Sequence, residues 1–414
     1  MILKMEKLAL LFSGQGAQYV GMADKICKRY KIADEVFNEA SEVLSIDLKD
    51  LANHSQDEIT LTYNAQPLIL TTSYAMYKAF CEEFDVKPTL MTGHSLGEVS
   101  ALAAAGAISF PDAVKIARKR GRIMQQVVSD IDGAMLAIKT RDVAEVEDMC
   151  SKIDSSLGTV EVANFNSKTQ TVVSGARAAV MQLEKILSDK QIKSTLLNVS
   201  APFHSRYMKP AAELMREELS KYTFSTTNIP VFSSSALTDY KTQQDVIDIL
   251  SEQLYRPVQW VKSMKHVYSQ NVTYGIEVGP GKVLKNLMKT NVSNIPVYAF
   301  DLEADVELAK QHVEESYLPF LTRSLGIAVA TKNNNQDFAE YEAGVVQPYN
   351  HISALAETVE NEGRKATRQE MDEAIQMLLS MFKTKHTPVD EQRRRFEELF
   401  IETGTQKEFS DFRI

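Results

Sequence analysis

Cysteine is scarce in this chain of 414 residues, which contains only Cys27, Cys81 and Cys150. They are odd in number, widely spaced and in no CxxC arrangement, so the pattern indicates neither a disulfide framework nor a zinc or redox site. We interpret them as small buried hydrophobic residues in a reducing compartment. Glycine and proline are also few, at 17 and 12 residues, which excludes collagen-like and low-complexity chains.

Long apolar runs and an excess of positive charge are absent as well. The longest apolar stretch, Ala101 to Phe110, is far shorter than the roughly 20 residues that span a bilayer. Acidic side chains outnumber basic ones by 55 to 46, which argues against a protein that grips a nucleic-acid backbone or an anionic membrane. We therefore expect a cytoplasmic monomer that binds neither nucleic acid nor membrane.

What is present is the composition of a globular protein, with 44% hydrophobic and 24% charged residues. At roughly 150 residues per domain, the length predicts two or three folding units. Strand-like and helix-like segments alternate through most of the chain. Residues 133–199 follow a βαββαβ order, which is typical of a small ferredoxin-like unit inserted into a larger domain.

The last hundred residues have a different character, because they are highly charged and carry helical patterns. Thr367 and Glu370 form a capping-box pattern ahead of an amphipathic stretch. Thr387 and Pro388 suggest a helix cap followed by a proline in the first helical position. We expect a mostly helical extension over residues 316–414.

The segment Gly93-His94-Ser95-Leu96-Gly97 lies between a short strand-like run at 89–92 and a small-residue helix at 98–105. This context fits a nucleophile elbow, in which small neighbours let a serine occupy a strained strand-to-helix turn. The alternative is an ordinary glycine turn with a solvated serine. A serine nucleophile also needs a base within hydrogen-bond reach and N–H donors for the oxyanion.

Two further segments are candidates for those partners. Of the seven histidines, His204 follows a predicted strand and precedes a helix, whereas His94 is better explained as a packing or hydrogen-bonding residue. His204 is the candidate base, and a satisfied loop histidine is the alternative. The Gly14–Gln18 turn follows a buried strand-like run at 7–13 and carries free backbone N–H groups, although an ordinary turn explains it equally well.

Taken in order, six motifs of this sequence resemble those of the malonyl-CoA:acyl carrier protein transacylases. The resemblance covers roughly residues 7–300. The motifs are Gly14-Gln15-Gly16-Ala17-Gln18, Gly93-His94-Ser95-Leu96-Gly97-Glu98, Arg120-Gly121 with Met124-Gln125, Phe203-His204, Gln253-Leu254-Tyr255-Arg256-Pro257-Val258 and Glu277-Val278-Gly279-Pro280-Gly281.

The resemblance implies a fold class and the catalytic roles. The fold class is α/β, with an α/β-hydrolase-like subdomain (1–132 and 200–315), the ferredoxin-like subdomain (133–199) and the helical extension (316–414). Ser95 is acylated and His204 is the base, oriented by the main-chain carbonyl of Gln253 in place of an acidic third member. The backbone N–H groups of Gln15 and Leu96 form the oxyanion hole.

Three side chains are implied to select the acyl group. Arg120, which lies 25 positions after Ser95, matches the family's arginine that binds the free carboxylate of malonyl through its planar fork. Without the resemblance, Arg120 would be assigned to a solvated basic helix face. Phe203 and Met124 line the acyl pocket, and the ring of Phe203 occupies the space that the α-methyl of methylmalonyl would need.

The implied function is the transfer of malonyl from malonyl-CoA to the phosphopantetheine thiol of an acyl carrier protein, with no metal or other cofactor. An acyl hydrolase that clears carrier proteins, and a non-catalytic docking protein, are the alternatives. Residues 320–335 and 340–349 are similar to the extension of discrete acyltransferases that serve polyketide synthases. We therefore expect polyketide synthase carrier domains as partners.

Overall fold

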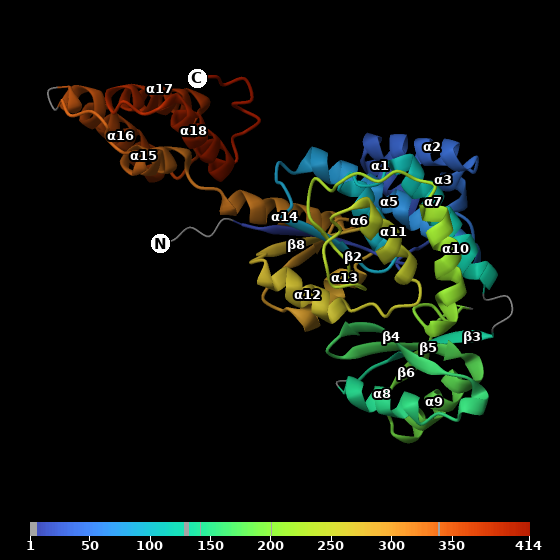
Figure 1. Ribbon diagram of the computed structural model, residues 1–414. Coiled ribbons are helices and arrows are strands. Elements are labelled where there is room, and N and C mark those ends of the chain that lie inside the picture. Colours follow the sequence, from blue (N-terminus) through green and yellow to red (C-terminus); the bar gives the residue numbers. More distant parts are fainter. Residues whose placement is uncertain (1–5, 128–131, 141, 200, 338–339) are drawn as a thin grey trace. The chain divides into compact units, whose positions relative to one another are not determined.

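The computed structural model describes residues 6–127, 132–140, 142–199, 201–337 and 340–414. The chain divides into two compact units, an N-terminal unit (Glu6–Ala309) and a C-terminal unit (Lys310–Ile414), and each is described by itself (Figure 1). The subdomain limits that we expected from the sequence stay predictions. Two of the limiting residues, 1 and 200, lie outside the described residues.

The N-terminal unit is built on a five-stranded sheet with the order β7-β2-β1-β8-β9, and all of its strand pairs are parallel. Phe12, at the end of β1, pairs with Gly93 on one side and Val278 on the other. The three central strands therefore end at one edge of the sheet, where their following loops meet. The strands are β1 (Leu8–Phe12), β2 (Leu90–Gly93), β7 (Val231–Phe232), β8 (Tyr274–Val278) and β9 (Val297–Ala299).

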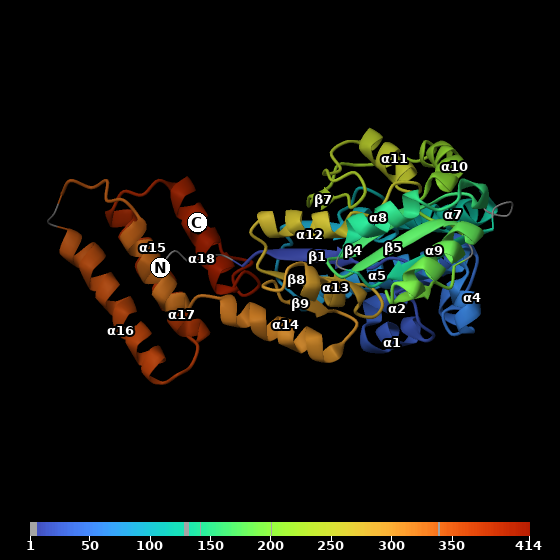
Figure 2. The ribbon, with the colours of Figure 1, turned by 90° about the horizontal axis from the view of Figure 1, so that it is seen from below.

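Helices cover both faces of this sheet (Figure 2). Leu11 of β1 belongs to a core cluster with Trp260 and Met264 of α12, whereas the ring of Phe12 faces Tyr77 of α5. Because both faces are buried, β1 is apolar throughout and does not alternate. The helices are α1 (Met22–Arg29), α2 (Lys31–Leu44), α3 (Leu48–Leu51), α4 (Gln56–Thr60), α5 (Thr62–Glu83), α6 (Gly97–Ala104), α7 (Phe110–Val127), α10 (Lys209–Leu219), α11 (Gln243–Glu252), α12 (Trp260–Ser269), α13 (Val283–Asn291) and α14 (Glu303–Ser316), which continues past residue 309.

A second, antiparallel sheet follows α7, with the order β4-β5-β3-β6. Helices α8 and α9 pack on one face of it, around a core that includes Leu136, Val173 and Leu183 (Figure 1). This order and connectivity are those of a ferredoxin-like unit, so the predicted fold class is confirmed. The elements are β3 (Gly133–Ile138), α8 (Val143–Ser151), β4 (Val160–Ser167), β5 (Gln170–Ala176), α9 (Arg177–Asp189) and β6 (Ser194–Leu196).

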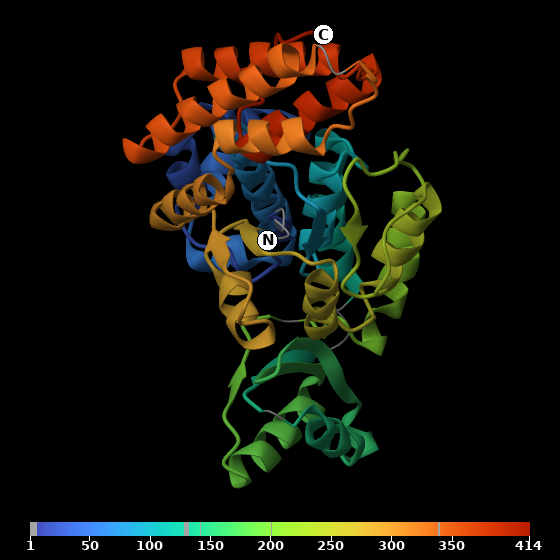
Figure 3. The same cartoon turned by 90° about the vertical axis from the view of Figure 1, so that its left-hand side faces the viewer.

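The C-terminal unit is built of helices (Figure 3). It has its own hydrophobic core. Ile327, Ile352, Leu378 and Leu399 come from four different helices and are all fully buried in that core. Such a core allows the unit to hold its shape by burying apolar surface. Its elements are α15 (Phe320–Ala330), the π-helical turn η3 (Glu342–Val346), α16 (Gln347–Asn361), α17 (Arg368–Thr384) and α18 (Val389–Thr403).

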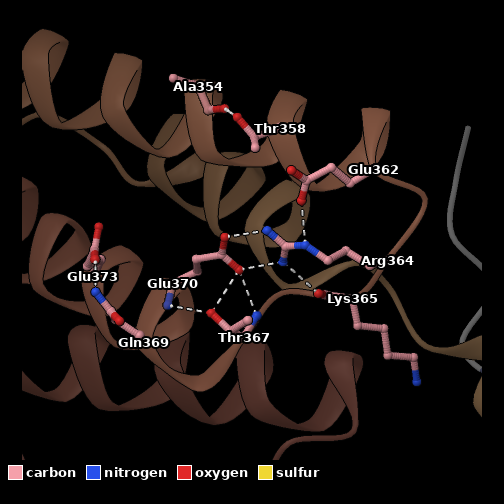
Figure 4. A network of polar contacts seen from close by, with 9 residues as sticks. All are labelled: Ala354, Thr358, Glu362, Arg364, Lys365, Thr367, Gln369, Glu370 and Glu373. Atoms are coloured by element: carbon pink, nitrogen blue, oxygen red, sulfur yellow. Dashed lines mark hydrogen bonds and ion pairs between the residues drawn. The ribbon is translucent and has the colours of Figure 1, made fainter.

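The capping box predicted for α17 is confirmed (Figure 4). The Thr367 side chain accepts from the backbone N–H of Glu370, and the Glu370 carboxylate accepts from the backbone N–H of Thr367 at 2.7 Å. Arg364 adds two hydrogen bonds of 2.8 Å to the same carboxylate. These contacts lower the pKa of Glu370 to about 2, with the Arg364 hydrogen bonds as the main cause.

Two expectations from the sequence are wrong. Pro388, not Thr387, is the cap of α18, because the extended backbone of Pro388 delays the helix by one residue and its carbonyl accepts from the N–H of Gln392. The cysteines are not buried: Cys27 and Cys150 are half-buried and Cys81 is exposed.

Among the helices in the described ranges, none combines the length and the apolar character needed to cross a membrane.

Candidate active site

Ser95 lies at a sharp turn between β2 and α6. Its backbone φ is +53°, in the left-handed region that non-glycine residues seldom adopt. The flanking glycines permit the turn, because a Cβ on Gly93 would lie 2.0 Å from the carbonyl carbon of Gly97, and one on Gly97 would lie 2.1 Å from the carbonyl oxygen of Phe12. The segment therefore has the predicted geometry of a nucleophile elbow, with the serine held in a strained backbone conformation.

His204 forms a hydrogen-bonded pair with this serine. The Ser95 Oγ lies 2.8 Å from His204 Nε2. On the other side of the ring, Nδ1 lies 2.9 Å from the carbonyl oxygen of Gln253 and 3.1 Å from that of Arg256. Because carbonyl oxygens only accept, Nδ1 carries the proton and Nε2 is free to accept the serine proton. The sequence predicted the Gln253 carbonyl and missed the one from Arg256.

The imidazole of His204 is kept neutral by its surroundings. Burial lowers its pKa to about 3, and the neighbouring positive charge of Arg120 is the second cause. The two carbonyl acceptors oppose this shift without reversing it. His204 is therefore in the form that can take a proton throughout the neutral range.

Two backbone N–H groups near the serine are available to an anion. The loops that carry Gln15 and Leu96 meet because β1 and β2 are parallel neighbours, and a Cβ on Gly14 would lie only 2.2 Å from the carbonyl oxygen of His94. Neither the Gln15 nor the Leu96 N–H has a hydrogen-bond acceptor within the part of the chain that the structure describes. Unsatisfied backbone donors beside a nucleophile are what an oxyanion hole requires.

Arg120 is not on a solvated helix face, since it is only 2% exposed. Its Nη2 lies 3.2 Å from Ser95 Oγ and donates to Gln253 Oε1 at 3.0 Å. Nε is buried without a partner, and the hydrogen bonds of the guanidinium to described residues all involve Nη2. Burial lowers the pKa of the guanidinium to about 10, so it remains a cation near neutral pH with donors to spare.

These groups open onto one cavity of about 480 Å³. Its lining includes Ser95, His204, Arg120 and Gln15, and the two residues expected in the acyl pocket, Phe203 and Met124. Met124 lies one helical turn after Arg120 on α7, so both side chains reach the same space. Leu96 directly follows Ser95, and Gln253 contacts His204 and Arg120 through its hydrogen bonds, although neither residue lines the cavity itself. All eight residues expected from the sequence thus meet at one site, and their catalytic roles stay predictions.

Comparisons with known proteins show the family of the chain. Residues 9–326 match the model of the acyl transferase domain. The chain belongs to the acyl transferase family. It is 34% identical over 397 residues to a malonyl CoA-acyl carrier protein transacylase of Bacillus subtilis, an alignment that covers 94% of this chain and 99% of the relative. Another transacylase of the same name, from Bacillus subtilis strain 168, is 39% identical over 75% of this chain and 98% of its own length.

Solved structures of transacylases share the fold of this acyltransferase. That of Coxiella burnetii aligns with a TM-score of 0.72 at 32% identity, covering 76% of this chain and 99% of the other. A malonyl-transacylase solved in complex with a type II PKS acyl-carrier protein aligns with a TM-score of 0.71 at 32% identity, over 74% of this chain and all of that one. The resemblance inferred from the six motifs is confirmed.

The acyltransferase site also contains polar residues to which the sequence assigned no role. Glu98, three residues after Ser95, is fully buried and accepts from the N–H and Oγ of Ser234 and from the Tyr240 hydroxyl. Burial raises the pKa of Glu98 despite these donors. Its place inside the elbow motif was a visible signal, but its partners lie about 140 residues away in the chain and only folding reveals them.

His94 has a structural role in this acyltransferase. Its Nε2 lies 2.8 Å from Asn166 Oδ1 on β4, and its ring faces Trp260 with centroids 5.5 Å apart. Burial lowers the pKa of His94, so the ring donates to the Asn166 oxygen as a neutral imidazole. The contact joins the elbow to the antiparallel sheet and agrees with the packing role that the sequence suggested.

Proposed function

We propose that this acyltransferase moves a malonyl group from malonyl-CoA to the phosphopantetheine thiol of an acyl carrier protein. One observation carries the proposal: the Arg120 fork lies within hydrogen-bond distance of Ser95 Oγ, and both residues line the same cavity. An acyl group on that oxygen has its chain beside a buried cation. A carboxylate at the end of a three-carbon chain matches that cation, whereas an uncharged chain leaves it unpaired.

The first half-reaction forms an ester on the enzyme. His204 Nε2 takes the proton of Ser95 as Oγ attacks the thioester carbonyl of malonyl-CoA, and the oxygen that becomes negative is held by the N–H groups of Gln15 and Leu96. The intermediate then collapses and the C–S bond breaks. The imidazolium of His204 returns its proton to the leaving CoA thiolate, so CoA departs as the thiol.

The second half-reaction reverses these steps with a different thiol. His204 takes the proton of the phosphopantetheine thiol, and the sulfur attacks the ester carbonyl of malonyl-Ser95. When the tetrahedral intermediate collapses, Ser95 Oγ leaves and recovers a proton from His204. Every proton shuttles through one imidazole, so the proposed reaction needs no metal and no other cofactor.

The acyl pocket supports malonyl over its α-methyl homologue. Phe203 immediately precedes the catalytic histidine, is 7% exposed and lines the cavity beside Ser95. A ring in that position competes with an α-methyl for the same volume. Discrimination of this kind is worth about 1–3 kcal/mol per methyl group, so we expect a preference and not an absolute selection.

We further propose that the carrier belongs to a polyketide synthase and that the enzyme serves it in trans. The Bacillus subtilis relative that aligns over 94% of this chain must share most of the C-terminal unit, while the relative from strain 168 spans only three quarters of the chain. A structural relative was solved with a type II PKS acyl-carrier protein. Free cysteines support a cytoplasmic site of action.

The test is intact-mass spectrometry of the full-length protein after mixing with malonyl-CoA, first alone and then with a phosphopantetheinylated carrier. A malonyl adduct that is absent in Ser95→Ala and that passes to the carrier supports the transferase. Release of mostly free malonate supports an acyl hydrolase instead, and no adduct at all supports a docking protein. Comparing a polyketide synthase carrier domain with a fatty-acid carrier protein tests the pathway, since faster transfer to the fatty-acid carrier contradicts it.

A further inference from the structure

The side chain of Gln253 lies between the nucleophile and Arg120, and the mechanism above uses only the main chain of this residue. It is fully buried. Its Oε1 accepts from Arg120 Nη2 at 3.0 Å, and its Nε2 donates to the carbonyl oxygen of Ser95 at 3.1 Å. A single carboxamide therefore ties the guanidinium to the backbone of the elbow.

Only one orientation of this carboxamide satisfies its neighbours. Turned by 180°, its NH₂ group would face the guanidinium of Arg120, donor against donor, and its oxygen would face the Ser95 carbonyl, acceptor against acceptor. Both partners are buried, so the reversed arrangement would leave polar groups of both unsatisfied. The Gln253 side chain is thus fixed relative to both residues.

The hydrogen bond to Gln253 leaves Arg120 with the donors that a carboxylate needs. Nη2 carries two hydrogens, and its two acceptors are Ser95 Oγ at 3.2 Å and Gln253 Oε1 at 3.0 Å. Once Ser95 is acylated, its oxygen becomes an ester oxygen and a weak acceptor. The Nη2 hydrogen that faced it is then free to join Nη1 in binding a carboxylate through two parallel hydrogen bonds, while Gln253 keeps the other Nη2 hydrogen.

We propose that the Gln253 side chain is a positioning residue that holds the guanidinium plane of Arg120 toward Ser95 Oγ, and thereby sets the preference for acyl groups that end in a carboxylate. This inference rests on the proposed malonyl transfer. A long arginine side chain loses rotamer freedom when it binds a carboxylate, and Gln253 supplies that order before the substrate arrives. Its loss therefore impairs charged acyl groups selectively.

The test compares a charged with an uncharged acyl donor in the Gln253→Met variant of the full-length protein. Methionine has a similar volume and removes both side-chain hydrogen bonds, while the main-chain carbonyl that orients His204 remains. We expect kcat/KM for malonyl-CoA to fall about 10- to 100-fold, the effect of one charge-assisted hydrogen bond. The rate with p-nitrophenyl acetate, corrected with Ser95→Ala, should fall by a factor at least several times smaller than that for malonyl-CoA, because it needs only the dyad and the oxyanion donors.

Two further variants separate positioning from general damage. Ser251→Ala removes another buried hydrogen bond, from Ser251 Oγ to the Ile247 carbonyl on α11, and touches neither Arg120 nor Ser95, so its malonyl-to-acetate ratio should match the wild type. Gln253→Glu keeps an acceptor on Arg120 but makes it an anion that competes with malonyl. We expect the KM for malonyl-CoA to rise at least tenfold, about 1.4 kcal/mol of lost binding, which is more than the loss in the p-nitrophenyl acetate rate that follows from removing the donor to the Ser95 carbonyl.

An equal loss with both donors in Gln253→Met overturns the inference, because it marks a purely structural residue. If that variant does not fold, an unchanged malonyl-CoA KM in Gln253→Glu overturns it instead. The proposed function fails separately, when the wild-type enzyme itself forms no malonyl ester on Ser95. The two failures are therefore distinguishable within one set of measurements.

Discussion

Replacing Arg120 tests the carboxylate clamp and the state of the catalytic histidine together. Arg120→Met keeps the length of the side chain and removes both its charge and its donors. A carboxylate held by two charge-assisted hydrogen bonds gains about 1.5–3 kcal/mol from each. We therefore expect kcat/KM for malonyl-CoA to fall by about 10² to 10⁴, since 1.4 kcal/mol is a factor of about ten.

The same variant should change an uncharged donor far less. Arg120 also donates to Ser95 Oγ at 3.2 Å, so the rate with p-nitrophenyl acetate should lose about tenfold, the lower end of the effect of one charge-assisted hydrogen bond because this contact is long. Arg120→Lys is the matched control, because it keeps the positive charge and loses the planar fork. We expect the lysine variant to lie between the wild type and the methionine variant with malonyl-CoA.

The pH dependence gives an independent readout of the same replacement. His204 must be neutral to act as a base, so activity is lost as the pH falls through its pKa, which burial and the Arg120 charge lower to about 3. The wild-type rate with p-nitrophenyl acetate should therefore stay level from pH 7 down to about 5. In Arg120→Met the second cause is gone, the pKa rises toward 6.5, and the acid limb should move to higher pH; in Arg120→Lys it should stay in place.

The measurement is the steady-state rate with both donors from neutral pH down through the acid limb. Circular dichroism at each pH confirms that the protein stays folded. If malonyl-CoA and p-nitrophenyl acetate lose the same factor in Arg120→Met, Arg120 does not bind the acyl carboxylate. If the acid limb does not move, the guanidinium charge does not add to the effect of burial in lowering the pKa of His204.

Three more results are expected. Phe203→Ser should raise the ratio of methylmalonyl to malonyl transfer about 5- to 100-fold, because roughly 1–3 kcal/mol of steric discrimination is lost. An unchanged ratio in a competition assay would show that Phe203 does not set the preference for malonyl. The pKa of His204 is about 3 in the folded protein and 6.5 for an unperturbed histidine, so between these values the unfolded state binds one more proton. The free energy of unfolding should therefore fall as the pH drops from 6.5 toward 3, by up to about 1.4 kcal/mol per pH unit. Chemical denaturation should show a shallower dependence of this free energy on pH for His204→Gln, and identical dependences would contradict the prediction. Thr367→Ala should remove the cap that accepts from the Glu370 N–H and destabilise the C-terminal unit by about 1 kcal/mol, measured by hydrogen exchange in α17, where unchanged protection would argue against the capping role.

The sequence by itself determined the local features of this protein. The uniformly apolar run that became β1 and the small residues around Ser95 are short-range patterns, because strand burial and a strained turn depend on a few adjacent residues. The βαββαβ order of residues 133–199 likewise follows from periodicity within each segment. The ordered motifs added His204, Gln253 and Arg120 as candidates, but by resemblance and not by any local signal.

The tertiary structure decided how distant residues act on one another. The sequence pattern around Arg120 predicts a basic helix face that is exposed to solvent. Only the packing of α7 buries Arg120 against Ser95 and Gln253. The second carbonyl acceptor of His204 and the partners of Glu98 also come from segments separated by tens of residues or more. Burial, hydrogen-bond geometry and pKa shifts depend on all groups that surround an atom, and those surroundings exist only after the chain has folded.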